Sequence, residues 1–187
     1  MTRLFSLALA LLLAVPVWAA ELGDDGLHKA HWMRDTFKDL PEDLAEATAE
    51  GKRLLVIVEQ RGCIYCTKMH EEIYPIPEID ALLTDDFFVV QINMFGDTEV
   101  VDFDGEVLSE KDLVRKWGLL FTPTLMFFPE EAGPVPGNDL AVATIPGAFG
   151  RWTTQNMLTW VLEKGYDSDE PFQKYHARKF AEHSDNQ

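Results

Sequence analysis

The chain has 187 residues, with 32 acidic and 16 basic side chains and a formal net charge of −16. A surface this acidic repels nucleic acid and anionic membranes, which argues against a role in binding either. It favours a partner with a basic docking patch, or it serves only to keep the protein soluble. Only two cysteines occur, which is fewer than an exported protein braced by disulfides usually carries.

The first residues have the layout of a secretory signal peptide. Arg3 is followed by an apolar run over residues 4–15, then by Pro16 and a triplet that ends at Ala19. A run of about twelve apolar residues is shorter than the roughly 20 that a spanning helix needs. We expect cleavage after Ala19 or Ala20 and export to the periplasm, with an uncleaved membrane anchor as the alternative. The remainder is long enough for one well-cored domain and too short for two.

Periodicity and capping residues predict alternating helices and strands in the first half of the chain. Residues 21–27 are polar and are expected to be mobile. Asp39 is placed to cap a helix that ends near Gly51. An apolar, β-branched run over 53–58 then predicts a strand buried on both faces. The further predicted elements are a helix from Cys63 to Tyr74, a short helix over 77–83 and a second buried strand over 87–92.

The second half continues the pattern after a small hairpin. The hairpin is predicted over 98–108, turning at Asp104-Gly105. Ser109 and Asp112 form a capping box for a helix that stops at Gly118. The remaining predicted elements are a strand over 125–128, a loop rich in Pro and Gly over 129–139, a strand over 140–145, a helix capped by Thr153 and ending at Gly165, and an amphipathic helix over 171–183. This order predicts an α/β protein with one central sheet.

Cys63 and Cys66 lie where a predicted strand, a tight turn and a helix meet. At the helix start, Cys63 faces unpaired N–H groups that stabilise a thiolate, the form of the thiol that attacks a disulfide. Arg61 adds a cation nearby, and Cys66 lies on the same helix face, where it can resolve a mixed disulfide. The pair therefore indicates a redox dithiol that needs no cofactor. Ile64 and Tyr65, inside the loop, are expected to line a docking surface.

Other interpretations of the cysteine pair stay open. Haem attachment requires a His after the second cysteine, and Thr67 stands there instead. A zinc site would need two more ligands, which His70 and the His28/His31 pair can supply. We expect no bound metal, because His70 is read as a helix-surface residue. An inert structural disulfide is the third interpretation, and a metal-binding or docking module without redox turnover is the alternative function.

Several segments resemble the thioredoxin superfamily. They are Cys63 to Cys66, Lys111 to Gly118, and the Phe121-Thr122-Pro123-Thr124-Leu125 segment. More narrowly, the chain resembles SoxW-type periplasmic thioredoxins of sulfur-oxidation systems. That resemblance rests on Asp39-Leu40, Asp43-Leu44-Ala45-Glu46-Ala47, Gly51-Lys52, Gly62-Cys63 and Tyr65-Cys66.

The resemblance implies a thioredoxin fold, in which helices flank a central mixed sheet, here with a small hairpin insertion. The resemblance covers a thioredoxin-like domain (39–165), which, together with the signal-peptide pattern, divides the chain into a signal peptide (1–19), an N-terminal extension (20–38), that domain and a C-terminal helical extension (166–187). It also implies that the protein exchanges thiols with disulfide-containing periplasmic proteins, and we expect it to be a monomer. Such proteins commonly draw electrons from a membrane thiol transporter.

The same resemblance assigns roles to single residues. It makes Cys63 the nucleophile, Cys66 the resolving thiol and Pro123 a cis residue that faces them. The backbone at Thr122 is expected to pair with an extended substrate segment, which is strand addition in physical terms. An ordinary trans turn is the alternative for Pro123, because most X-Pro bonds are trans.

The chain also departs from thioredoxin beside the cysteines. Gly62 stands where that family has Trp, and Ile57 stands where it has a buried Asp. The usual proton acceptor for Cys66 is therefore missing. Glu59 lies on the same strand face as Ile57 and is the candidate substitute, with a solvated strand-end carboxylate as the alternative.

Overall fold

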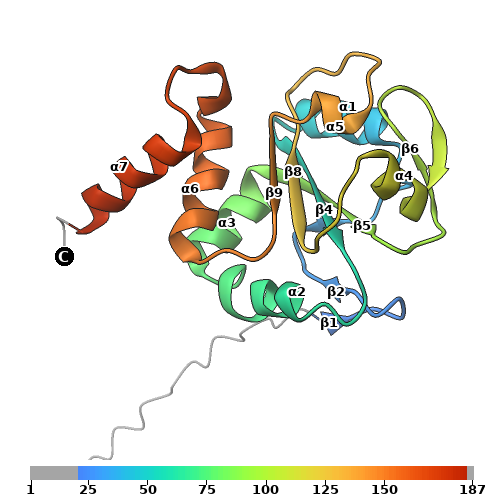
Figure 1. The fold of residues 1–187 in the computed structure, drawn as a ribbon, viewed down its shortest axis with the longest axis horizontal. Helices are drawn as coiled ribbons and strands as arrows, with labels where there is room; N and C mark the ends of the chain where they lie inside the picture. Colours follow the sequence, from blue (N-terminus) through green and yellow to red (C-terminus); the bar gives the residue numbers. More distant parts are fainter. Residues whose placement is uncertain (1–20, 185–187) are drawn as a thin grey trace, which may run out of the picture.

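The computed structural model describes residues 21–184, so the predicted signal peptide lies outside the described residues. Its centre is a five-stranded mixed sheet in the order β3-β5-β4-β8-β9 (Figure 1). The strands span β3 (Met33–Arg34), β4 (Arg53–Glu59), β5 (Phe87–Asn93), β8 (Thr124–Phe127) and β9 (Ala143–Pro146). Neighbours β3, β5 and β4 run parallel, whereas β8 pairs antiparallel with both β4 and β9. The predicted α/β class and single central sheet are confirmed.

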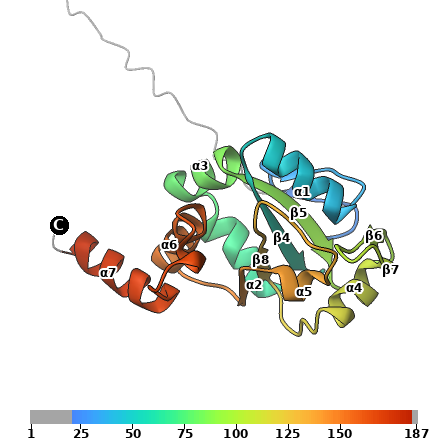
Figure 2. The same ribbon diagram turned by 90° about the horizontal axis from the view of Figure 1, so that it is seen from above.

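Helices cover both faces of this sheet (Figure 2). One face is covered by α1 (Leu40–Ala49) and α4 (Glu110–Lys116), and the other by α2 (Ile64–Lys68), a π-helical turn η1 (Met69–Ile73), α3 (Pro77–Asp85) and α6 (Arg151–Leu162). Because β4 is buried along its whole length, its side chains supply both cores. Among the described residues, no helix has the length and apolar character to cross a membrane.

The smaller elements extend this three-layer arrangement. They are β1 (Glu21–Leu22), β2 (His28–Lys29), the hairpin β6 (Glu99–Val101) and β7 (Val107–Ser109), α5 (Gly137–Leu140), a short 3₁₀ turn η2 (Gly165–Asp167) and α7 (Phe172–Ser184). Helix α7 packs against α6 on the side away from the sheet (Figure 1).

Local capping explains why several predicted boundaries are confirmed. The Asp39 side chain accepts a hydrogen bond from the Glu42 N–H at the start of α1. Ser109 does the same for the Asp112 N–H at the start of α4. Gly118 follows α4 with a φ of +68°, a conformation that favours glycine and ends the helix.

Residues 21–27 contain β1, which pairs with β2, and the chain then leads to β3, which adds a strand to the sheet edge. The expected mobility of residues 21–27 stays a prediction. Two predicted element boundaries were wrong. Thr153 does not cap α6, because the helix begins at Arg151 with Gly150 as its N-cap residue. Leu140 ends α5, so the following strand starts only at Ala143.

One buried carboxyl group lies between α1 and the N-terminal segment. Asp43 is buried on α1, and its carboxylate accepts a hydrogen bond of 3.2 Å from the Thr36 hydroxyl. Burial raises the pKa of Asp43 from 3.8 to about 6, and the neighbouring acidic side chains of Asp39 and Glu46 raise it further against the opposing effect of Thr36. The folded protein therefore binds this proton more tightly than the unfolded chain does.

Asp43→Asn should make stability less dependent on pH. The proton bound by folded Asp43 stabilises the fold. This stabilisation is fully present below pH 3.8 and is lost as the pH rises through about 6. At pH 7 we expect the variant to be more stable than the wild type by about 2 kcal/mol, with little difference at pH 4. Urea unfolding at both pH values measures this. An equal difference at the two pH values would show that Asp43 does not titrate in this range.

Candidate active site

The turn after β4 places Cys63 at the beginning of α2. Gly62 has a φ of +71°, which turns the chain from the strand into the helix. Cys63 is the N-cap residue of α2, and its sulfur accepts a hydrogen bond of 3.0 Å from the Cys66 N–H. The two sulfurs form a disulfide, with 5.2 Å between the Cα atoms. The predicted helix start at Cys63 is confirmed.

The two cysteines differ in their surroundings. Cys66 is fully buried, whereas Cys63 retains 6% of its accessible surface. Ile64 and Tyr65, between them, are 74% and 58% exposed. Cys63 is therefore the sulfur that an outside group can approach, and the loop dipeptide faces solvent beside it.

A second loop, which precedes β8, reaches the same sulfur. The Thr122-Pro123 peptide bond is cis, as predicted, and the Thr122 hydroxyl donates a hydrogen bond of 3.3 Å to Cys63 Sγ. Leu120 and Phe121 precede this step and are 78% and 62% exposed. Two loops that meet at Cys63 thus present large apolar side chains to solvent.

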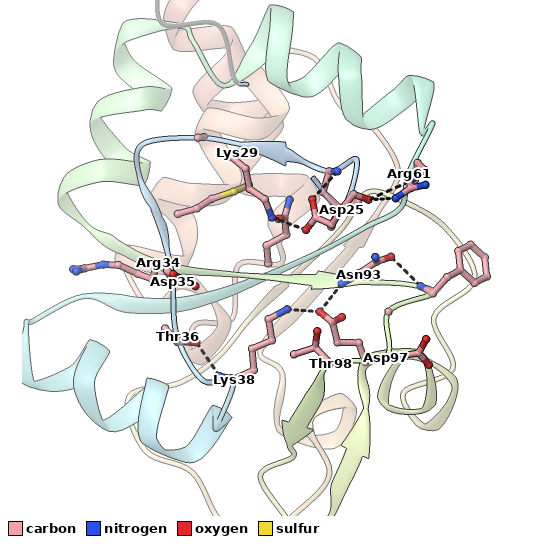
Figure 3. A pocket seen from close by; sticks show the side chains of 17 residues that line it. Asp25, Lys29, Arg34, Asp35, Thr36, Lys38, Arg61, Asn93, Asp97 and Thr98 are labelled. Carbon is pink, nitrogen blue, oxygen red and sulfur yellow. Dashed lines mark hydrogen bonds and ion pairs between the residues drawn. The ribbon is translucent and has the colours of Figure 1, made fainter. Parts of the chain in front are cut away.

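Arg61 is directed toward the N-terminal segment. Its guanidinium donates hydrogen bonds of 3.1 and 3.0 Å to the Asp25 carbonyl oxygen (Figure 3). Gly26 packs so closely on this side chain that a Cβ atom there would lie 2.6 Å from Arg61 Nε. The contact holds residues 21–34 against the turn before Cys63. A contribution of this cation to the Cys63 thiolate stays a prediction.

A hollow of about 800 Å³ opens beside this contact, between the N-terminal segment and the edge of β5 (Figure 3). Its lining carries four cations: Arg61 donates to a backbone carbonyl, and the other three each have an anionic partner within the protein. Lys29 pairs with Asp25, and Lys38 with Glu110. Arg34 pairs with Glu50.

Glu59, at the end of β4, is buried rather than solvated. Only 1% of its surface is exposed. Its two carboxylate oxygens have separate partners: His70 Nε2 at 2.9 Å and Gln91 Nε2 at 2.6 Å. The alternative of a solvated strand-end carboxylate is therefore wrong.

His70 is also buried, which corrects its interpretation as a helix-surface residue. It lies in the π-helical turn η1 with 1% of its surface exposed. The ring stacks on His28 at a centroid distance of 4.6 Å and meets the edge of Tyr74 at 5.0 Å, with Trp32 beyond at 6.1 Å. Sequence reasoning named His70 only as a possible zinc ligand and missed its burial, although its position four residues after the buried Cys66 was a usable signal.

His28, Glu59 and His70 together form a potential metal-ligand set. One donor atom from each lies within 4.8 Å of the others. The two imidazole rings, however, are stacked with an interplanar angle of 11°. Ring-nitrogen lone pairs lie in the ring plane, so two nearly parallel rings cannot direct them at one ion. The predicted third histidine, His31, instead contacts Thr84.

Comparison with known families agrees with this geometry. A family model for the thioredoxin-like domain matches residues 40–141, more than half of the chain. The chain belongs to this thioredoxin-like family. No curated protein sequence matches it significantly.

Solved structures confirm the thioredoxin fold. A thioredoxin from Thermus thermophilus is 25% identical, with a TM-score of 0.53; the match covers 68% of this chain and 86% of that one. A thioredoxin-fold protein from Helicobacter pylori is 15% identical, with a TM-score of 0.51 over 78% of this chain and 92% of that one. The narrower resemblance to SoxW-type thioredoxins stays a prediction.

The difference in burial predicts different reactivity of the two thiols. After reduction at near-neutral pH, iodoacetamide should modify Cys63 at least about tenfold faster than Cys66, because only Cys63 combines access with the helix N-terminus. Peptide mass spectrometry of quenched samples measures both rates, and the urea-unfolded protein is the control in which they should converge. Faster modification of Cys66 would reverse the roles of the two sulfurs.

Proposed function

We propose that this protein is an exported thiol–disulfide oxidoreductase that reduces disulfides of periplasmic proteins. The observation that carries the proposal is the Cys63–Cys66 disulfide at the start of α2, with the cis Thr122-Pro123 loop in contact with Cys63. Membership of the thioredoxin-like family supports it. A disulfide with only a structural role would not need an accessible sulfur, nor exposed apolar side chains around that sulfur.

The reaction proceeds through two exchanges of sulfur bonds. The reduced Cys63 thiolate attacks one sulfur of the partner's disulfide, and the other partner sulfur leaves as a thiolate. Cys63 is then joined to the partner in a mixed disulfide. The Cys66 thiolate attacks Cys63, the bond to the partner breaks, and the second partner sulfur leaves with its electron pair. The partner gains two electrons, and the protein is left with the Cys63–Cys66 disulfide.

The exposed loops suit a protein substrate. An extended substrate segment would pair its backbone with the chain at Thr122, in the manner of an added strand. Ile64 and Tyr65 on one loop, and Leu120 and Phe121 on the other, supply apolar contacts on either side of Cys63. These contacts can bind the unfolded or extended chain around a disulfide without selecting a particular sequence.

The signal-peptide pattern supports the proposed location, and the resemblance to periplasmic thioredoxins supports the proposed electron source. The signal-peptide pattern of residues 1–19 supports export, and a periplasmic reductase needs electrons delivered across the membrane. A membrane thiol transporter is the proposed donor to the Cys63–Cys66 disulfide. The protein would act as a monomer, since each chain contains both cysteines and the cis-proline loop.

Replacing one cysteine at a time should separate the two steps. Cys66→Ser keeps the attacking thiol and lacks the resolving one, so stable mixed disulfides with periplasmic proteins should accumulate. Cys63→Ser should trap almost nothing, because the remaining thiol is buried. Non-reducing gels and mass spectrometry after exposure to periplasmic extract measure the difference. Equal trapping by both variants, or none by either, would contradict the proposed roles.

A further inference from the structure

We propose that Phe95 determines which protein disulfides are reduced, by contacting an apolar side chain of the partner chain a few residues from the cysteine that joins Cys63. The inference rests on the proposed function, because it concerns the substrate of the Cys63–Cys66 pair. Sequence reasoning named no site residue in the loop after β5. The topology of the sheet places this loop beside Cys63.

Cys63 and Phe95 follow neighbouring parallel strands. Glu59, at the end of β4, is level with Asn93, at the end of β5. Because the two strands run in the same direction, the segments that follow them emerge at the same edge of the sheet, which is where α/β proteins bind their ligands. The contact continues beyond the strands, since the Met94 N–H donates a hydrogen bond of 2.7 Å to the Glu59 carbonyl oxygen. The two loops are therefore adjacent.

A partner chain can span the distance between the two positions. The Cys63 N–H donates a hydrogen bond of 3.3 Å to the Gln60 carbonyl oxygen, which closes a turn whose end Cα atoms lie less than about 7 Å apart. From Gln60 the hydrogen bond between Glu59 and Met94 leads directly to the residue before Phe95. Together these steps place the Phe95 Cα at most about 20 Å from that of Cys63, so roughly six residues of extended chain cover the gap.

Phe95 lies on the opposite flank of Cys63 from the cis-proline loop. Strand β4 stands between β5 and β8 in the sheet. Strand β8 begins level with the end of β4, so Phe121, which precedes β8, emerges at the same sheet edge as Cys63. A partner chain that pairs with Thr122 on one side of its cysteine can therefore contact Phe95 on the other side.

The loop that carries Phe95 is held in place by hydrogen bonds. The Phe95 N–H donates a hydrogen bond of 3.1 Å to Asn93 Oδ1, and the Asn93 N–H donates one of 2.9 Å to the buried Glu110 carboxylate. The Gly96 carbonyl oxygen accepts a hydrogen bond of 3.0 Å from the Lys111 N–H, and a Cβ atom at Gly96 would overlap the Glu110 carboxylate. An aromatic side chain on such a loop loses little conformational freedom on binding.

The side chain of Phe95 is 69% exposed. One exposed apolar side chain is ordinary on a protein surface. Its companions make this one different, because five of the ten large apolar side chains that are exposed among the described residues lie in the three segments at this sheet edge. These five are Ile64, Tyr65, Phe95, Leu120 and Phe121. Phe95 is the member on the β5 side, where it adds a preference to contacts that bind any extended chain.

The hollow beside Phe95 leaves room for the partner chain to continue. Phe95 and Arg61 line the same hollow of about 800 Å³, and Arg61 stands two residues before Cys63. The hollow follows the end of β5 (Figure 3), which β3 covers only as far as Val90. Its occupant is therefore an extended segment of the partner protein, continuous with the chain that is joined to Cys63.

Two disulfide peptides test this contact. Each has one intramolecular disulfide with six-residue arms on both sides, and the arms contain leucines in one peptide and serines at the same places in the other. At pH 7 we expect the reduced wild type to react about tenfold faster with the leucine peptide, and Phe95→Ser to lower this preference about fivefold. Alkylation of quenched samples and mass spectrometry give the rate constants.

Two controls separate the contact from damage to the fold. A small aromatic disulfide has no arms, so Phe95→Ser should change its rate less than about twofold. Phe180→Ser makes the same substitution at an exposed position on α7, far from this edge (Figure 1), and should change neither the preference nor the rate. An unchanged leucine preference in Phe95→Ser, or an equal loss of rate with the small disulfide, would overturn the inference.

A trapped complex tests the contact without altering Phe95. In the mixed disulfide between Cys66→Ser and the leucine peptide, nuclear Overhauser effects should connect the Phe95 ring with a leucine methyl group. Their absence would overturn the inference. Failure of the proposed function has a different signature, because a wild type that reduces neither the peptides nor the small disulfide has an inactive dithiol. A wild type that reduces all of them without preferring leucine rejects only the role of Phe95.

Discussion

The position of Cys63 at the N-terminus of α2 is the constraint on which the site depends. Strand β4 is buried along its whole length, so it must end where the chain can turn out of the core, and Gly62 makes that turn. The first residue after the turn, Cys63, keeps a small accessible surface and lies at the helix N-terminus, where N–H groups lack helical partners. The cis Thr122-Pro123 step follows α4 and brings Thr122 to the same sulfur.

The N-terminal segment is part of the site's construction. It reaches the turn through the contact between Arg61 and the Asp25 carbonyl, and it reaches the sheet through β3. Between these two attachments it places His28 and Trp32 over the His70 ring. This cover keeps the pair of Glu59 and His70 away from water. Their interaction is stronger in this buried setting than it would be at the surface.

The sequence predicted most of the fold because its signals were local. Each signal depends only on residues a few positions away along the chain. These signals are the caps at Asp39 and Ser109, the buried runs of β4 and β5, and the cysteine spacing. The burial of His70 could not be predicted in this way, because it depends on a π-helical turn and on covering rings from distant His28 and Trp32. The start of α6 was misplaced because Gly150, which has no side chain to cap with, precedes a better capping residue at Thr153.

The reduction potential of the Cys63–Cys66 pair tests the central claim most directly. The protein would be equilibrated with dithiothreitol or glutathione buffers of stepped potential, and the fraction of free thiol counted by mass spectrometry after alkylation. A reductase predicts one reversible two-electron transition near that of thioredoxin, about −270 mV. A transition near about −120 mV would mark an oxidant of proteins. A disulfide that does not exchange reversibly at any buffer potential would contradict a redox function.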